Sequence, residues 1–480
     1  MTDLLLQPDP AARWTASGTF RHAMPGGERG GLTGLCSYLG ELTDKGRETT
    51  YALGERLRHL YVDQLKFMPP LIANADLIYL RATPLPRALE SVQQVFWGMY
   101  PLPARTAAFP AATIVTRTPA DETLFPNDGN CRRFAQLSRA FAQRAADRWN
   151  DSDDMMYLNK LISKWMPESS KKVAVDSHPR LSGIMDTINS TLAHGPETRL
   201  PKEFYDEKGR AIVDKIGVEE WFSGYNESRE YRTVGIGALV GDIVERMISK
   251  VEGAGLSIQE VGGVNGQPGK GRGGETGIRL ALSGCHDTTL AALLTSMGAF
   301  NGEKWPPYTS HIAIELFRQR DAKPSVDPAP RDTPPGETNQ QAGATRPGWI
   351  AGLLGLRSSS PNSKASEPSR DFSTREPGAA LEGIARRPYV DLSDEEKKKL
   401  EGYYVRLRFN DRVMYVPGCA QAGRHLEGDK SFCTLEAFKR VADGFTPRNW
   451  KSQCGHNLDQ PAHGLIDGTQ EWAGQIEEGF

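Results

Sequence analysis

A short apolar run that leads through a charged residue into a helix occurs twice in this sequence, and this pattern constrains the fold most strongly. In the first copy, residues 75–80 (ADLIYL) are rich in strand-forming side chains and stop at Arg81. A helix is expected next, because Pro86 suits a first helical turn and Gly98 with Pro101 marks an end. This order predicts a buried strand followed directly by a helix.

The second copy lies in the sequence GIRLALSGCHDTTLAALLTSMGAF. Residues 278–282 are expected to form the strand, and His286 lies just past its end. Asp287 or Thr288 is expected to cap a helix that ends near Met297. Residues 311–319 (HIAIELFRQ) alternate like another strand. Strand-to-helix units of this kind predict an α/β fold.

The charged residues that follow the two strands predict a binding site for an anion. Ligands of open α/β sheets bind outside the carboxyl ends of the strands, so Arg81, His286 and Asp287 are expected to face one crevice. An arginine fork matches the paired oxygens of phosphate or carboxylate, and a neighbouring aspartate can act as a general acid. The alternative is that Arg81 pairs with a carboxylate at a strand end and that Asp287 merely caps its helix.

Composition argues against several classes of protein. The formal net charge of -2 argues against binding nucleic acid through phosphate neutralisation. No apolar run approaches the ~20 residues of a membrane-spanning helix. The start of the chain lacks the basic region of a signal peptide, so a cytoplasmic protein is expected as written, with mitochondrial or secretory targeting open for a longer chain. The six cysteines form no C-x-x-C pair, so no metal site is expected.

The rest of the chain divides by composition into segments of core, cap and linker. Residues 320–400 are rich in Pro, Ser, Gly and charge, and they are expected to be a disordered insertion. Within it, 348–356 (GWIAGLLGL) is a weak candidate for binding a protein partner. The other expected segments are an irregular N-terminal segment 1–39, α/β core at 40–120, 278–319 and 401–455, a mostly helical cap at 121–255, a glycine-rich loop at 256–277 and a flexible tail at 456–480.

Several motifs resemble those of the histidine acid phosphatases. Residues 79–101 (YLRATPLPRALESVQQVFWGMYP) resemble the signature in which Arg-Ser/Ala-Thr is followed by an Arg and a Ser. Residues 285–300 (CHDTTLAALLTSMGAF) resemble the His-Asp signature, and 40–58 (GELTDKGRETTYALGERLR) resemble the segment that follows the nucleophile loop. Residues 304–317 (KWPPYTSHIAIELF) and the tail with Cys419 and Cys433 are most similar to the lysophosphatidic acid phosphatase branch.

This resemblance implies a phosphoglycerate mutase-like mixed α/β sheet with flanking helices and a helical cap. It also implies hydrolysis of phosphate monoesters, with lysophosphatidate among the candidate substrates. Arg81 and His286 would bind the phosphate, Asp287 would protonate the leaving group, and no metal or other cofactor would be needed. The resemblance also implies that Cys131 can pair with Cys454 and Cys419 with Cys433, depending on the compartment of the protein.

The family's nucleophilic histidine lies in an Arg-His-Gly-x-Arg-x-Pro loop after the first, central strand, and that motif is not found here. The nearest match, Arg21-His22, is followed by Ala23, and no apolar run precedes it. Residues 15–27 are therefore expected to be a loop, the central strand to be missing, and the nucleophile to be unassigned. Two interpretations stay open: a phosphatase with an incomplete catalytic site and little or no turnover, and an inactive relative that binds phosphate-bearing ligands or protein partners.

Overall fold

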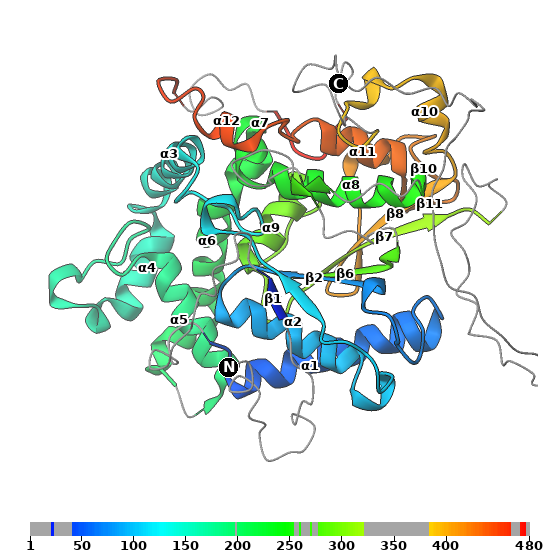
Figure 1. Cartoon of the computed structure of the whole chain (residues 1–480). Helices are drawn as coiled ribbons and strands as arrows, with labels where there is room; N and C mark the ends of the chain where they lie inside the picture. The colour runs from blue at the N-terminus through cyan, green and yellow to red at the C-terminus, as the bar shows by residue number, and fades with distance from the viewer. Residues whose placement is uncertain are drawn as a thin grey trace, which may run out of the picture.

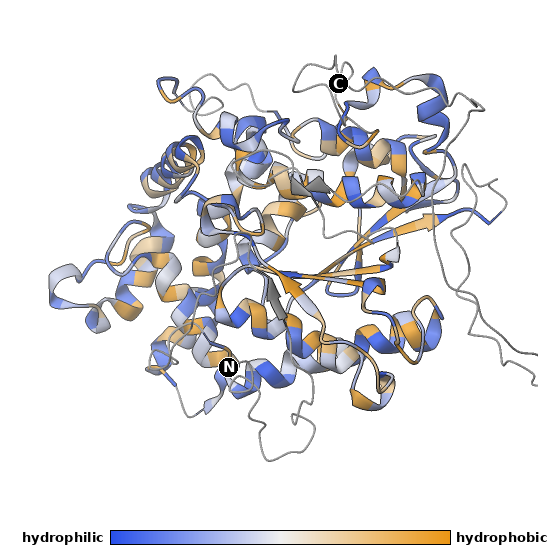
Figure 2. Cartoon of the chain, viewed as in Figure 1, coloured by the Kyte–Doolittle hydropathy of each residue, from blue (hydrophilic) through white to orange (hydrophobic). Residues whose placement is uncertain are grey.

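Two β-sheets lie at the centre of the computed structural model, with helices on both sides of them (Figure 1). The structure describes residues 41–196, 199–253, 277–320, 384–461 and 471–476, and the backbone of three short strands at 21–23, 259–260 and 269–270. Figure 2 shows that the strands are largely apolar, whereas the outer faces of the helices are largely hydrophilic. This distribution identifies the strands as the centre of the core.

The first sheet is parallel, in the order β1–β3–β2–β6. Its strands are β1 (Arg21–Ala23), β2 (Ile78–Ala82), β3 (Thr113–Val115) and β6 (Leu280–Gly284). All residues of β2 are buried, and Leu80 pairs with Ile114 on one side and Leu282 on the other. A continuous apolar run is what a strand covered on both faces requires, so the expected buried strand is present here.

The second sheet is antiparallel and follows the order β10–β11–β8–β7, with β9 also paired to β8. Its strands are β7 (Ile312–Arg318), β8 (Tyr403–Phe409), β9 (Arg412–Met414), β10 (His425–Leu426) and β11 (Asp429–Thr434), and a separate pair is formed by β4 (Gln259–Glu260) and β5 (Gly269–Lys270). Asn410 and Asp411 have positive φ angles and turn the chain between β8 and β9.

The α-helices are α1 (Asp44–Arg58), α2 (Pro86–Met99), α3 (Arg132–Trp149), α4 (Asp153–Ile162), α5 (Leu181–His194), α6 (Glu207–Glu227), α7 (Arg229–Arg232), α8 (Ala238–Glu252), α9 (Asp287–Ser296), α10 (Asp394–Lys398), α11 (Leu435–Asp443) and α12 (Trp450–Cys454). Thr43 caps α1 by accepting a hydrogen bond from the Gly46 amide, and Pro86 opens α2 as expected. His286, the residue before Asp287, is the N-cap of α9. Helices α3 to α6 lie beside the sheets, on the left in Figure 1.

Helices α1 and α2 cross in close contact because each contributes a glycine. A Cβ atom added at Gly54 would lie 2.2 Å from the carbonyl oxygen of Val95, and one added at Gly98 would lie 2.1 Å from that of Tyr51. Neither position has room for a side chain. The two glycines therefore allow the first strand–helix unit to pack against the helix that precedes it.

Both disulfides that the family resemblance implied are present. Cys131–Cys454 joins residues 323 positions apart, with a Cα–Cα distance of 4.7 Å. Cys419–Cys433 joins β11 to the turn before β10, with a Cα–Cα distance of 5.3 Å. The first bond attaches the C-terminal part of the chain to the start of α3.

Two expectations about irregular segments differ from the structure. Arg21-His22 lies in β1 rather than in a loop, because its backbone pairs in register with β3. Residues 384–400 are ordered, since the buried Lys439 side chain donates to the carbonyls of Ala385 and Arg387, and α10 follows. The partner candidate at 348–356, most of the glycine-rich loop and the end of the tail lie outside the described residues.

The expected mixed α/β architecture with flanking helices is confirmed by these two sheets and their helices. In the described parts of the chain, every helix is too short or too polar to cross a lipid bilayer.

Candidate active site

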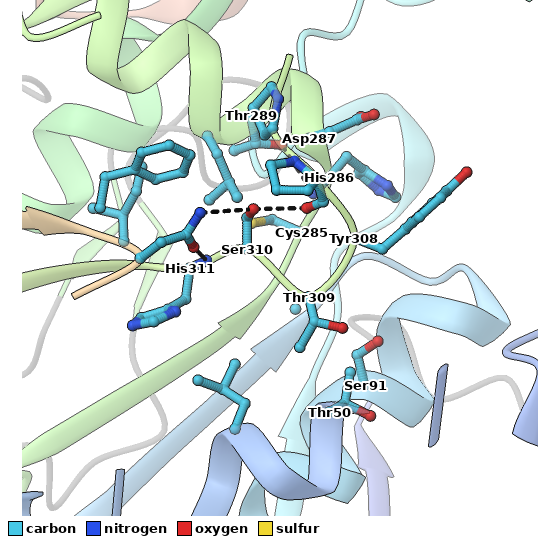
Figure 3. Close-up of a pocket in the computed structure, with 18 of the residues that line it drawn as sticks. Thr50, Ser91, Cys285, His286, Asp287, Thr289, Tyr308, Thr309, Ser310 and His311 are labelled. Atoms are coloured by element: carbon cyan, nitrogen blue, oxygen red, sulfur yellow. Dashed lines mark hydrogen bonds between the residues drawn. The ribbon is translucent and has the colours of Figure 1, made fainter. Parts of the chain in front are cut away.

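A cavity of about 2700 Å³ is bordered by strands β6 and β7, one from each sheet, and residues at the ends of several helices and strands line it. Its lining includes His286 and Asp287 at the start of α9, Arg87 in the first turn of α2, and apolar residues of β6 and β7. Figure 3 shows His286, Asp287 and Tyr308 at one part of this pocket, with Thr50 and Ser91 on the helices across from them. His286 and Asp287 therefore border one cavity at the end of β6.

His286 is half-buried and held on several sides. Its ring Nε2 lies 3.0 Å from the Thr83 hydroxyl, and its ring meets Phe125 edge-on at 5.9 Å between centroids. Burial and the charge of Arg87 lower the pKa of His286, while Asp287 and Glu122 act in the opposite direction. The imidazole is consequently neutral near neutral pH and gains its proton more readily when an anion binds beside it.

Asp287 is the first residue of α9, and both of its carboxylate oxygens accept a hydrogen bond. The Thr288 amide donates to Oδ1 at 2.7 Å, and the indole Nε1 of Trp305 donates to Oδ2 at 2.8 Å. Each oxygen keeps a further lone pair that can meet a proton or a ligand. The expected cap at Asp287 or Thr288 is wrong, because His286 is the N-cap of α9; Asp287 follows it as the first helical residue and lines the cavity.

Arg81 lies behind the cavity rather than in its lining. Its side chain is fully buried, and its guanidinium donates to Glu122 at 2.7 Å and to Asp242 at 3.4 Å. Arg117 joins the same cluster through Asp242 at 3.0 Å. The geometry thus matches the alternative that Arg81 pairs with carboxylates at a strand end, and its role as a phosphate ligand stays a prediction.

Arg87 is a cation of the cavity lining that the positions of the strand ends did not predict. It is exposed, it lines the cavity, and its charge adds to the burial that lowers the pKa of His286. The sequence contains a signal for this residue: Arg87 is the second arginine of the run RATPLPR, and it lies in the first turn of a helix, whose N-terminus favours anions.

β6 and β7 are the last strands of their sheets, and both border the cavity. β6 pairs with β2 and β7 pairs with β8; no described strand pairs with the other edge of either. Leu282 and Ile314, on these two strands, are only partly buried. The expectation that a central strand is missing stays a prediction.

The strand that carries Arg21-His22 lies elsewhere in the sheet. β3 and β2 separate β1 from β6. Three strand spacings of about 4.8 Å put β1 roughly 14 Å from β6. The backbone register therefore places His22 well to the side of the loop that carries His286 and Asp287.

The sequence matches the model of the histidine phosphatase superfamily (branch 2) over residues 33–327. The match covers more than half of the chain, and the chain belongs to this superfamily. It is also 35% identical over 424 residues to a probable acid phosphatase of Schizosaccharomyces pombe, a match that covers 88% of this chain and 78% of the yeast protein. These findings confirm the family resemblance.

Other relatives are more distant. Lysophosphatidic acid phosphatase type 6 of Bos taurus and of Homo sapiens are each 26% identical to this chain over 288 residues, or 60% of it. The match spans 58% and 59% of their lengths. Among solved structures, the apo form of Hafnia alvei phytase has a TM-score of 0.49 at 10% identity, covering 88% of this chain and 90% of that one.

Proposed function

We propose that this chain binds phosphate monoesters in the cavity at the end of β6, as a phosphomonoesterase whose described side chains supply only part of the catalytic site. The observation that carries the proposal is the presence of His286, Asp287 and Arg87 in the lining of one cavity. Arg87 and His286 favour a bound anion, and Asp287 can deliver a proton beside it. The superfamily of the chain supports the same class of reaction.

Each of these described side chains would have a separate role toward a bound monoester. Arg87 and His286 would bind non-bridging phosphate oxygens, and the N-terminus of α9 would add to the attraction. Asp287 would pass its proton to the ester oxygen as the phosphorus–oxygen bond breaks, so that the alcohol leaves neutral. The phosphoryl group must pass to a nucleophile, and this group remains unassigned among the described side chains.

The proposed substrate class is a monoester with an apolar alcohol portion, such as lysophosphatidate. The same cavity is also lined by Leu53, Leu57 and Ile314. The phosphate group would contact the polar residues, and the hydrocarbon portion would contact these apolar side chains. The name of the bovine and human relatives, lysophosphatidic acid phosphatase type 6, supports this choice.

The second candidate function is binding without turnover. The observation that favours it is the position of β1, which holds Arg21-His22 three strands away from β6. Such a chain would retain affinity for phosphate-bearing ligands through Arg87 and His286, and it would release no alcohol.

The test measures binding and hydrolysis of p-nitrophenyl phosphate at acid pH by the wild type, His286→Gln and His311→Gln. His311 lines the same cavity but bonds to Asp411, so it is a matched control. We expect the monoester to bind with little or no turnover, and binding to be lost only in His286→Gln. Turnover that survives in His286→Gln would overturn the site, and absence of binding to both phosphate and lysophosphatidate would overturn the function.

A further inference from the structure

The loop between α9 and β7 places a tryptophan against the proposed proton donor. The indole Nε1–H of Trp305 donates to Asp287 Oδ2 at 2.8 Å. The Thr288 amide donates to the other oxygen at 2.7 Å. With one donor on each oxygen, the carboxyl group is fixed in its plane and keeps one orientation toward the cavity.

Trp305 is itself anchored in the helices of residues 121–255, the segment expected to form the cap. Its backbone amide donates to Asp214 Oδ1 on α6 at 2.9 Å. Its ring packs against Phe222, with 4.8 Å between centroids, and meets Trp221 edge-on at 6.0 Å. The indole therefore cannot turn away from Asp287 without disturbing α6.

The same loop makes a second contact with the cap. The Tyr308 hydroxyl donates to Asp186 on α5 at 3.0 Å. Thr309, the next residue, has a positive φ of 62°, which is costly for a β-branched residue. Its hydroxyl lies 2.8 Å from that of Thr49 on α1. Backbone strain held by contacts on several elements is typical of functional positions.

We propose that Trp305 is a positioning residue that holds the Asp287 carboxyl against the leaving-group oxygen of a bound monoester and ties this orientation to the cap. The inference rests on the proposed function, because Asp287 must face the ester oxygen for its orientation to matter. A purely packing role would need an aromatic ring but no N–H group directed at a carboxylate of the cavity.

Trp305→Phe separates these two roles, since it keeps an aromatic ring and removes the donor. Trp221→Phe is the matched control: it changes the neighbouring indole, which lies outside the lining of the cavity. The measured quantity is the ratio of affinities for p-nitrophenyl phosphate and inorganic phosphate, by calorimetry at acid pH, with KM and kcat added if turnover occurs. Inorganic phosphate carries no leaving alcohol, and its four oxygens can exchange positions, so it serves as the reference for binding of the phosphate group.

We expect Trp305→Phe to leave phosphate affinity unchanged and to lower monoester affinity about fivefold, the equivalent of one hydrogen bond. Asp287→Ala is expected to do the same, and the double variant should match Asp287→Ala, because Trp305 acts through Asp287. If the wild type hydrolyses the monoester, we expect Trp305→Phe to lower kcat by a larger factor than it raises KM.

Three results would count against the inference in distinguishable ways. An unchanged ratio in Trp305→Phe, with a lowered ratio in Asp287→Ala, overturns it alone. Additive losses in the double variant overturn it as well. A wild type that binds neither ligand overturns the proposed function together with this inference.

A second measurement leaves Trp305 in place, in case its replacement impairs folding. In ¹⁵N–¹H spectra of the tryptophan indoles, we expect p-nitrophenyl phosphate to shift one resonance of the wild type, and Asp287→Ala to abolish that shift. A ligand-saturated wild type with no shifted indole resonance contradicts the inference.

Discussion

Arg81 and Arg87 stand at opposite ends of one strand-to-helix turn and have opposite surroundings. Arg81 is fully buried between Glu122 and Asp242, whereas Arg87 is exposed to the cavity. Replacing Arg81 with Met should leave two buried carboxylates short of a cation and lower the free energy of unfolding by about 3–5 kcal/mol. Arg87→Met should change it by less than about 0.5 kcal/mol.

Chemical denaturation of both variants measures this difference. Equal stability of Arg81→Met and the wild type would contradict a structural role for Arg81. It would also return Arg81 to consideration as a phosphate ligand.

His286 makes the stability of the fold depend on pH. Burial, aided by Arg87, lowers its pKa below the ordinary value of about 6.5, so the unfolded chain binds this proton more tightly. The stabilising effect of the neutral imidazole is fully present above about pH 6.5 and is lost as the pH falls toward the folded-state pKa. We expect His286→Gln to lose less stability than the wild type between about pH 7.5 and pH 5, as measured by urea denaturation. Equal losses would show that His286 does not titrate in this way.

For single residues, the sequence predicts where a functional residue lies along the chain more readily than the direction in which its side chain points. The end of the strand locates Arg81, His286 and Asp287 correctly along the chain. It does not predict that Arg81 turns inward, because its partners Glu122 and Asp242 are 41 and 161 positions away. The hydrogen bond from Trp305 to Asp287 cannot be predicted from the sequence for a related reason. A loop between a helix and a strand has no periodicity that indicates which of its side chains faces the cavity.

At the scale of helices and strands, the contact between α1 and α2 is the most sensitive to volume. Gly54→Ala would place a methyl group 2.2 Å from a backbone oxygen, so the helices must separate. We expect a loss of about 2 kcal/mol or more in unfolding free energy. Gly183→Ala on α5 is the matched control, since no atom lies within 4 Å of its added Cβ.

The control substitution Gly183→Ala should leave the free energy of unfolding unchanged or raise it by about 0.5–1 kcal/mol. Thermal unfolding of the two variants gives the comparison. A Gly54→Ala protein as stable as Gly183→Ala would mean that the two helices are not in this close contact.

Local patterns predict most of these elements because each begins or ends with a residue of strong preference. Thr43 and Pro86 start α1 and α2 as expected, whereas the N-cap of α9 is His286 rather than Asp287 or Thr288. The same patterns fail for β1 and for residues 384–400. Pairing with β3 forms β1, and the buried Lys439 side chain fixes the segment around Ala385, so both depend on partners far away in the sequence.

At the scale of the whole molecule, the disulfide Cys131–Cys454 connects parts of the chain that are 323 positions apart. Closing so long a loop restricts the unfolded chain strongly, and we expect the double variant Cys131→Ser/Cys454→Ser to lose about 4 kcal/mol of stability. Cys419→Ser/Cys433→Ser, which opens a separation of 14, should lose less. Guanidinium denaturation measures both, and an equal or reversed order would contradict this account.

We propose one cavity, bordered by β6 and β7, as an anion site built by Arg87 and His286 with Asp287 beside them. The most direct test is calorimetry of inorganic phosphate with the wild type and with Arg87→Gln at about pH 5.5. We predict one phosphate bound per chain, and an affinity at least about tenfold lower in Arg87→Gln because a charge-assisted pair is lost. No heat with the wild type, or equal affinity in the variant, would contradict the claim.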